Sequence, residues 1–143
     1  MQAMSRRSTI DLIECPRDAF QGWKKDTPTD LIVRYLNTLL RVGFHTLDFG
    51  SFVSAKAVPQ MAVTDEVLYG LDMKNTHTRL LAIVANTRGA EEAAAHAHID
   101  YLGFPFSISD SFQLRNTNST IEESLQRVEE IQDICIKNNK TLV

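Results

Sequence analysis

An arginine and an aspartate stand side by side at Arg17 and Asp18, in the stretch ECPRDAFQ, directly after the apolar run at positions 10–13. A charged pair at the end of a buried strand needs partners, because a charge that loses its hydration there is costly. A guanidinium held still at such a place can stabilise negative charge that develops on an oxygen atom. The pair is therefore the first candidate for a site that does chemistry.

Further polar side chains follow the other apolar runs of the chain. In a parallel sheet the active site lies at the carboxyl ends of the strands, so these side chains would converge on one rim. They are Gln21 in the first segment, Asp48 and Ser51 at the end of the second, Asn86 after the third, and Ser109, Ser111, Arg115, Asn116 and Asn118 after the fourth. Loop residues are polar in any case, and for the serines and asparagines that alternative stays open.

The spacing of the apolar residues indicates which elements position these side chains. Strands are expected at positions 10–15, 44–49, 79–85, 99–106 and 141–143, the first and third of them buried. Helices are expected at 28–42, capped by Thr27 and ended by Gly43, at 64–72, capped by Thr64, and at 88–97. A capping box from Ser119 to Glu122 opens a last helix, whose apolar face is Ile121, Leu125, Val128, Ile131 and Cys135.

Strands and helices thus alternate roughly every 35 residues, which is typical of a parallel sheet with crossover helices. Two architectures compete: an open doubly wound sheet and a closed (β/α)8 barrel. The GxGxxG turn of a dinucleotide-binding open sheet is absent after the first expected strand. A barrel takes about 250 residues, so this chain would hold about half of one. No linker interrupts the pattern, and positions 1–143 are interpreted as a single domain with a flexible N-terminus at 1–9.

The composition narrows the class of protein. Of the 143 residues, 43% are hydrophobic, enough for one sizeable core, and the net charge is −3, which argues against a nucleic-acid partner. No apolar run approaches the roughly 20 residues of a membrane span, and the start, MQAMSRRST, has no apolar signal region. Cys15 and Cys135 lie in apolar segments and are interpreted as reduced, buried thiols of a cytoplasmic protein.

His96 and His98 form a His-x-His pair, a spacing familiar from metal sites. The pair precedes the fourth expected strand and would lie at the amino end of the sheet, opposite the rim described above. We therefore interpret it as a solvated helix end. His45 and His77 also precede strands, so no histidine is expected on the catalytic face.

Three blocks of the sequence, PRDAFQ, LDFGSFVSAKAVPQM and SFQLRNTNSTIEES, resemble the hydroxymethylglutaryl-CoA lyase family in the same order. The resemblance implies an α/β fold, a (β/α)8 TIM barrel of which this chain supplies about the first four βα units and the start of the fifth strand. It also implies a carbon–carbon lyase that cleaves 3-hydroxy-3-methylglutaryl-CoA, or a close 3-hydroxyacyl-CoA, to acetyl-CoA and acetoacetate with Mg²⁺ or Mn²⁺. Related condensing synthases share the Arg-Asp opening but lack the SFVS–VPQM block, and they rank lower.

The resemblance also assigns roles to residues. Arg17 would lie beside the carbonyl oxygens of the acyl-CoA substrate, and Asp18 would be a ligand of the divalent metal. Gln21 would line the pocket. Ser51, Asn86 and Ser109 are the further candidates for substrate binding.

The chain departs from the family around this pocket. Ala19, Phe20 and Gly22 stand where glycine, leucine and asparagine are usual, and GFPFSIS at 103–109 is bulkier than the usual strand. Asp48 stands where glutamate is usual, and we expect this shorter carboxylate to pair with Arg17 and hold it against the substrate. These changes leave the exact acyl group open.

The family's own His-x-His metal ligands, an asparagine ligand and a loop with a catalytic cysteine come from later strands and have no counterpart before position 143. We expect either a longer protein of which this is the front half or a half-barrel that binds another chain through its exposed edges. The isolated chain is expected to be inactive. A homo-oligomer, such as a dimer, is the expected assembly.

Overall fold

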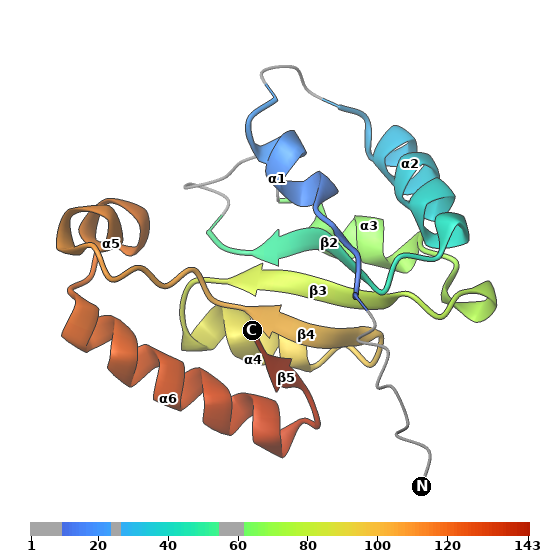
Figure 1. The fold of residues 1–143 in the computed structure, drawn as a ribbon. Helices are drawn as coiled ribbons and strands as arrows, with labels where there is room; N and C mark the ends of the chain where they lie inside the picture. Colours follow the sequence, from blue (N-terminus) through green and yellow to red (C-terminus); the bar gives the residue numbers. More distant parts are fainter. Residues whose placement is uncertain (1–9, 24–26, 55–61) are drawn as a thin grey trace, which may run out of the picture.

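The computed structural model describes residues 10–23, 27–54 and 62–143, so the expected flexible segment at 1–9 lies outside the described residues. The described elements, in chain order, are β1 (Ile13–Glu14), α1 (Pro16–Gln21), α2 (Thr29–Val42), β2 (Thr46–Phe52), α3 (Thr64–Tyr69), the 3₁₀ turn η2 (Met73–Asn75), β3 (Arg79–Val84), α4 (Thr87–Ala94), β4 (Ile99–Gly103), α5 (Asp110–Thr117), α6 (Ile121–Lys137) and β5 (Thr141–Leu142). Each strand is followed by one or two helical segments before the next strand begins (Figure 1).

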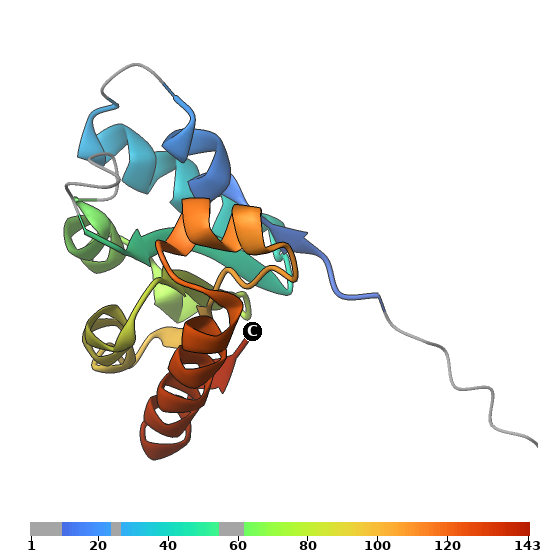
Figure 2. The same ribbon diagram turned by 90° about the vertical axis from the view of Figure 1, so that its left-hand side faces the viewer.

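The five strands are parallel and lie in the order β1-β2-β3-β4-β5, which is also their order in the chain. An open doubly wound sheet reverses its strand order at a switch point and carries helices on both faces. Here the order never reverses, and α2, α3 and α4 lie together on one side of the sheet (Figures 1 and 2). This is the winding of a barrel wall, and the expectation of a partial (β/α)8 barrel is confirmed.

The core lies between the sheet and these helices. Leu80, Ala82 and Val84 alternate along β3 and pack in one cluster with Leu36 of α2 and Ile131 of α6, all of them buried. Leu81, on the opposite face of β3, is buried as well, so the expectation of a strand buried on both faces is confirmed.

The first strand differs from its expectation. Only Ile13 and Glu14 have strand geometry, and Ile10, Leu12 and Ile13 are 85%, 64% and 53% exposed. The reason is that β1 is an edge strand, which among the described residues pairs only with β2. Cys15, which follows it, is exposed, so its interpretation as a buried thiol was wrong.

Two helices were missed by the apolar spacing, α1 and α5. Each buries a single side chain, Pro16 in α1 and Gln113 in α5, so neither has a stripe of buried apolar residues that would indicate a helix. Cys135 of α6 is buried as expected, whereas Leu125, expected on the same apolar face, is 51% exposed. The buried position of that turn is taken by Ser124.

The helix ends correct three cap assignments. Helix α2 is capped by Pro28, not Thr27, and it ends as expected at Gly43, whose φ of 84° suits glycine. Thr64 is the first residue of α3, and the N-cap of that helix is Val63. The capping box of α6 is formed by Thr120 and Glu123, one residue later than expected, because Ser119 is buried and its hydroxyl bonds Thr117 and Ser124.

Candidate active site

Arg17 and Asp48 form an ion pair across two elements. Arg17 lies in α1, which begins directly after β1, and Asp48 lies in the neighbouring strand β2. The Nε of Arg17 is 3.1 Å from both carboxylate oxygens of Asp48, and its Nη2 donates to Oδ2 at 2.8 Å. The side chains are only 14% and 5% exposed. The pairing expected from the sequence is confirmed, and it is charge-assisted and largely shielded from water.

Burial and pairing act in opposite directions on these two groups. Burial raises the pKa of Asp48 above that of an ordinary aspartate, and the hydrogen bonds from Arg17 hold that rise down. Burial lowers the pKa of Arg17, but its hydrogen bonds with Asp48 and the charge of that carboxylate outweigh this and raise it. Arg17 is therefore a permanent cation in a place that water barely reaches.

Gln21 completes the support of the guanidinium, because its Oε1 accepts a hydrogen bond of 2.8 Å from Arg17 Nη1. Asp18 is different: its carboxylate is 78% exposed and lies 3.6 Å from Nη1. The hydrogen bonds among the described residues thus use Nε and one N–H of each terminal nitrogen of Arg17. Within residues 10–23, 27–54 and 62–143, one N–H on each terminal nitrogen makes no hydrogen bond and is available to an oxygen of a ligand.

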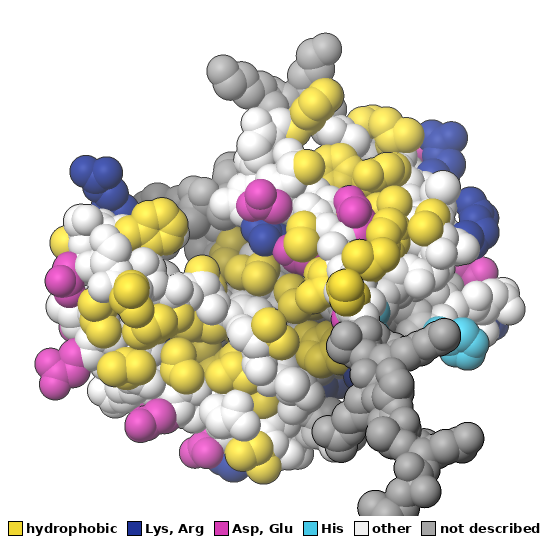
Figure 3. Space-filling model, in the orientation of Figure 1, with side chains coloured by type: hydrophobic (Ala, Val, Ile, Leu, Met, Phe, Trp, Pro, Cys, Tyr) yellow, Lys and Arg dark blue, Asp and Glu magenta, His cyan; other side chains and the backbone are white. Residues whose placement is uncertain are grey.

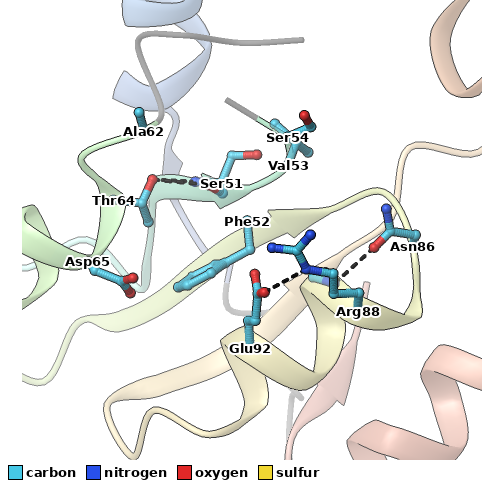
Figure 4. Close-up of a pocket in the computed structure, with 11 residues that line it drawn as sticks. Ser51, Phe52, Val53, Ser54, Ala62, Thr64, Asp65, Asn86, Arg88 and Glu92 are labelled. Atoms are coloured by element: carbon cyan, nitrogen blue, oxygen red, sulfur yellow. Dashed lines mark hydrogen bonds and ion pairs between the residues drawn. The ribbon is translucent and has the colours of Figure 1, made fainter. Parts of the chain in front are cut away.

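Ser51 and Asn86 lie in a separate cavity of about 280 Å³, which Arg17, Asp18 and Asp48 do not line (Figure 4). Ser51 is inside β2, which runs on to Phe52 and not only to position 49 as expected, and its Oγ donates to the backbone carbonyl of Ile83 at 3.2 Å. Asn86 caps α4, since its side chain accepts from Gly89 N–H at 2.9 Å. The expected convergence of polar residues on one rim therefore holds only in part.

Ser109 lies just before α5 and contacts its own loop. Its N–H donates to Ser107 Oγ at 3.1 Å, and its hydroxyl is 3.3 Å from that of Ser111. The loop is held by a residue that apolar spacing could not identify. Gln113 is fully buried, and its Oε1 accepts from Ser107 N–H at 2.7 Å while its Nε2 donates to Ser124 Oγ at 2.6 Å.

The histidines do not assemble a metal site. His96 lies 3.1 Å from the carboxylate of Asp65 and against the ring of Phe52, whereas His98 is exposed. Within residues 10–23, 27–54 and 62–143 there is no group of three or more His, Cys, Asp or Glu side chains that could hold a metal ion. Asp18 thus belongs to no such group among the described residues.

No family model matches the chain, but its sequence is similar to those of several named proteins. The cytoplasmic 3-hydroxy-3-methylglutaryl-CoA lyase of Rattus norvegicus is 35% identical over 116 residues, which are 81% of this chain and 33% of that protein. The mitochondrial hydroxymethylglutaryl-CoA lyase of Arabidopsis thaliana is 39% identical over 114 residues, 78% of this chain and 24% of that protein.

Solved structures agree with this result. The HMG-CoA lyase of Brucella melitensis superimposes with a TM-score of 0.83 at 32% identity over 93% of this chain and 48% of that one. The HMG-CoA lyase of Acinetobacter baumannii, in complex with coenzyme A and 3-methylmalate, superimposes with a TM-score of 0.85 at 28% identity over 99% of this chain and 45% of that one. The chain thus spans a quarter to a third of these two curated relatives and just under half of the solved chains.

Proposed function

Because the chain belongs to the hydroxymethylglutaryl-CoA lyase family, we propose that it carries the arginine side of the active site of a carbon–carbon lyase. The substrate would be 3-hydroxy-3-methylglutaryl-CoA or a close 3-hydroxyacyl-CoA, and the products would be acetyl-CoA and acetoacetate. The observation that carries the proposal is the ion pair of Arg17 and Asp48, which fixes a cation at the end of the first strand. The coenzyme A in the related Acinetobacter structure supports an acyl-CoA partner.

The reaction requires a fixed positive charge. A base takes the proton of the tertiary hydroxyl, the carbon–carbon bond breaks, and the hydroxyl oxygen becomes the keto oxygen of acetoacetate. The electron pair of the broken bond passes to the enolate of acetyl-CoA, whose charge gathers on the thioester oxygen, and a proton then returns to the enolate carbon to give acetyl-CoA. The two N–H groups that Arg17 retains are suited to bind that oxygen, and Asp48 and Gln21 already hold the guanidinium, so it need not reorganise.

The remaining assignments follow from the positions of the residues at or after the carboxyl ends of the strands. Ser51 and Asn86 line a polar cavity of their own, and we propose that they contact the substrate away from the reacting carbons. Ser109 would contact it from the loop after β4. The described residues contain no helix with the length and hydrophobicity of a membrane span. We propose a cytoplasmic location, as for the rat relative, while other relatives are mitochondrial.

The described residues do not by themselves fit a complete Mg²⁺ or Mn²⁺ site. Such ions take about six oxygen ligands, and Asp18 offers one exposed carboxylate without a cluster around it. We therefore propose Asp18 as one member of a ligand set that the described residues leave incomplete. A divalent metal bound there would lower the pKa of the substrate hydroxyl.

The test compares this chain with a hybrid protein, in which residues 10–143 replace the matching segment of a related lyase. We expect no acetyl-CoA release by the isolated chain with Mg²⁺, and metal-dependent release by the hybrid. Arg17→Gln in the hybrid should lower kcat by roughly three orders of magnitude, because the enolate loses its counter-charge. A folded hybrid without activity, or turnover by the isolated chain, would refute the proposal.

A second candidate function, a half-barrel that binds another protein chain, is favoured by the exposed apolar surface. Apolar side chains gather over α5 and α6 and around α1 and α2 on the face shown in Figure 3. Ile108 and Ile136 are 90% and 67% exposed. Exposed apolar patches of this kind mark interaction sites. Light scattering tests this candidate: self-association is expected of a chain that exposes such a surface and also fits the expected homo-oligomer, whereas a monodisperse monomer counts against both.

A further inference from the structure

Strand β2 contains a bulge beside the candidate catalytic pair. Asp48 pairs with Leu81 of β3 and Gly50 pairs with Ala82, so Phe49 has no partner of its own in that strand. A bulge of this kind bends the strand and redirects the side chains beyond it. The segment that presents Asp48 is thus irregular and needs a contact that holds it in one shape.

The bulge decides which side chains face the helices. Leu47 and Phe49 belong to the core cluster, and Phe52 packs against it. The side chains that face the helices are thus two residues apart before the bulge and three residues apart across it. Asp48 lies between two core residues and faces the opposite side of the sheet, where it meets Arg17. If the strand lost the bulge, the residues on one side of it would turn to the opposite face of the sheet.

Thr64 of α3 contacts the strand at this point. Its hydroxyl donates to the backbone carbonyl of Ser51 at 3.0 Å and accepts from the backbone N–H of the same residue at 3.3 Å (Figure 4). Thr64 is only 6% exposed. One buried hydroxyl therefore binds both backbone groups of the residue that follows the bulge.

The contact is close because residue 50 is glycine. A Cβ atom at Gly50 would lie 2.8 Å from Thr64 Cγ2 and 3.3 Å from its Oγ1. Carbon atoms do not approach to 2.8 Å without displacement, so any larger residue would push Thr64 away from the strand. Gly50 and Thr64 thus fit each other across two elements.

We propose that Thr64 is a positioning residue, whose hydroxyl fixes the bulge of β2 and so holds Asp48 where it binds Arg17. The geometric part of this inference stands on the contacts of Thr64, Ser51 and Asp48. Its consequence for turnover rests on the proposed function. Hydrogen exchange at Ser51 and Arg17 is therefore measured first, and the kinetics of the hybrid lyase second.

The first experiment measures hydrogen exchange by NMR in two variants of the whole chain. Thr64→Val has the same shape but no hydroxyl, and we expect the Ser51 amide to exchange about tenfold faster or more. We also expect the Arg17 Nε–H to exchange faster, because its carboxylate partner is no longer held. Thr64→Ser keeps the hydroxyl and should leave both rates within about twofold of the original protein.

A rescue experiment keeps the inference testable if Thr64→Val does not fold. Gly50→Ala alone should displace Thr64 and speed exchange at Ser51 and Arg17. Gly50→Ala combined with Thr64→Ser removes the clashing Cγ2 and keeps the hydroxyl, so it should restore slow exchange at both positions. Failure of this rescue would overturn the inference.

The decisive readout is Arg17, because a merely structural role would not move it. If Thr64→Val lowers the melting temperature and leaves Arg17 Nε–H exchange unchanged, Thr64 only packs α3 and the inference is wrong. In the hybrid lyase we expect Thr64→Val to lower kcat about tenfold with little change in KM. Altered exchange without any kinetic effect would support the geometry and count against the proposed role of Arg17 instead.

Discussion

Replacing Arg17 by Met removes the charge and the donors but keeps most of the side-chain volume. Asp48, whose side chain is 5% exposed, then loses its contacts with Nε and Nη2. Removing one partner of a buried ion pair typically costs 3–5 kcal/mol, because the other charge is left unpaired. Since Arg17 is 14% exposed and water can enter the gap, we expect a loss near the lower end, about 3 kcal/mol at pH 7.

The loss should depend on pH with a defined sign. Burial raises the pKa of Asp48, and in the variant no guanidinium opposes that rise. The folded variant then binds a proton more readily than the unfolded chain does. Relative to the original protein, its stability is therefore greatest below the pKa that Asp48 has in the folded original protein, and it is lost as the pH rises through the higher pKa of the folded variant. The cost of Arg17→Met should shrink as the pH is lowered from 7.

Urea denaturation across a pH series measures this effect, with Trp23, the single tryptophan of the chain, as the fluorescent probe. Arg34→Met is the matched control, because the Arg34–Asp30 pair is exposed at 71% and 72% and should contribute less than about 0.5 kcal/mol. The cycle of Arg17→Met, Asp48→Asn and the double variant should give a coupling of about 2 kcal/mol. A cost no larger than that of the control, or one independent of pH, would refute the reasoning.

Three further outcomes are expected. Asp18→Asn should weaken Mn²⁺ binding to the hybrid lyase without changing its unfolding midpoint; an unmoved titration would leave Asp18 only as a neighbour of Arg17. Asp48→Glu should keep activity within about tenfold, whereas Asp48→Ala should lose roughly 10- to 100-fold, and a fully active alanine variant would reduce Asp48 to a structural residue. Burial, and then the charge of Asp48, raises the pKa of Cys15, so Asp48→Asn should speed its alkylation at pH 7.5; an unchanged rate by mass spectrometry contradicts this.

Local patterns predicted most of the fold because each depends on residues close in sequence. Helix α2 places Ile32, Leu36 and Leu40 on one buried face, and Gly43 ends it in the left-handed conformation. Strand β3 is a short apolar run that is buried on both faces. The alternation of such segments is enough to predict a parallel sheet.

The same patterns failed where burial depends on distant partners. An apolar run at 10–13 predicts a buried strand, yet β1 is an edge, and Ile10 is 85% exposed. Leu125 has the spacing of a core residue but lies outside, while Ser124 and Gln113 are buried and satisfy each other by a hydrogen bond. Neighbouring elements decide such choices, and no spacing within one element reveals them.

For the site, the sequence by itself determined which chemical groups are available: a guanidinium beside a carboxylate after the first strand, and a second carboxylate at position 48. Only the tertiary structure decided how they are held. The bulge at Asp48 and Gly50 and the bonds from Thr64, 13 residues away from Ser51, depend on two elements packing together. The physical reason is that a backbone irregularity persists only where its polar groups find partners, and here the partner comes from another helix.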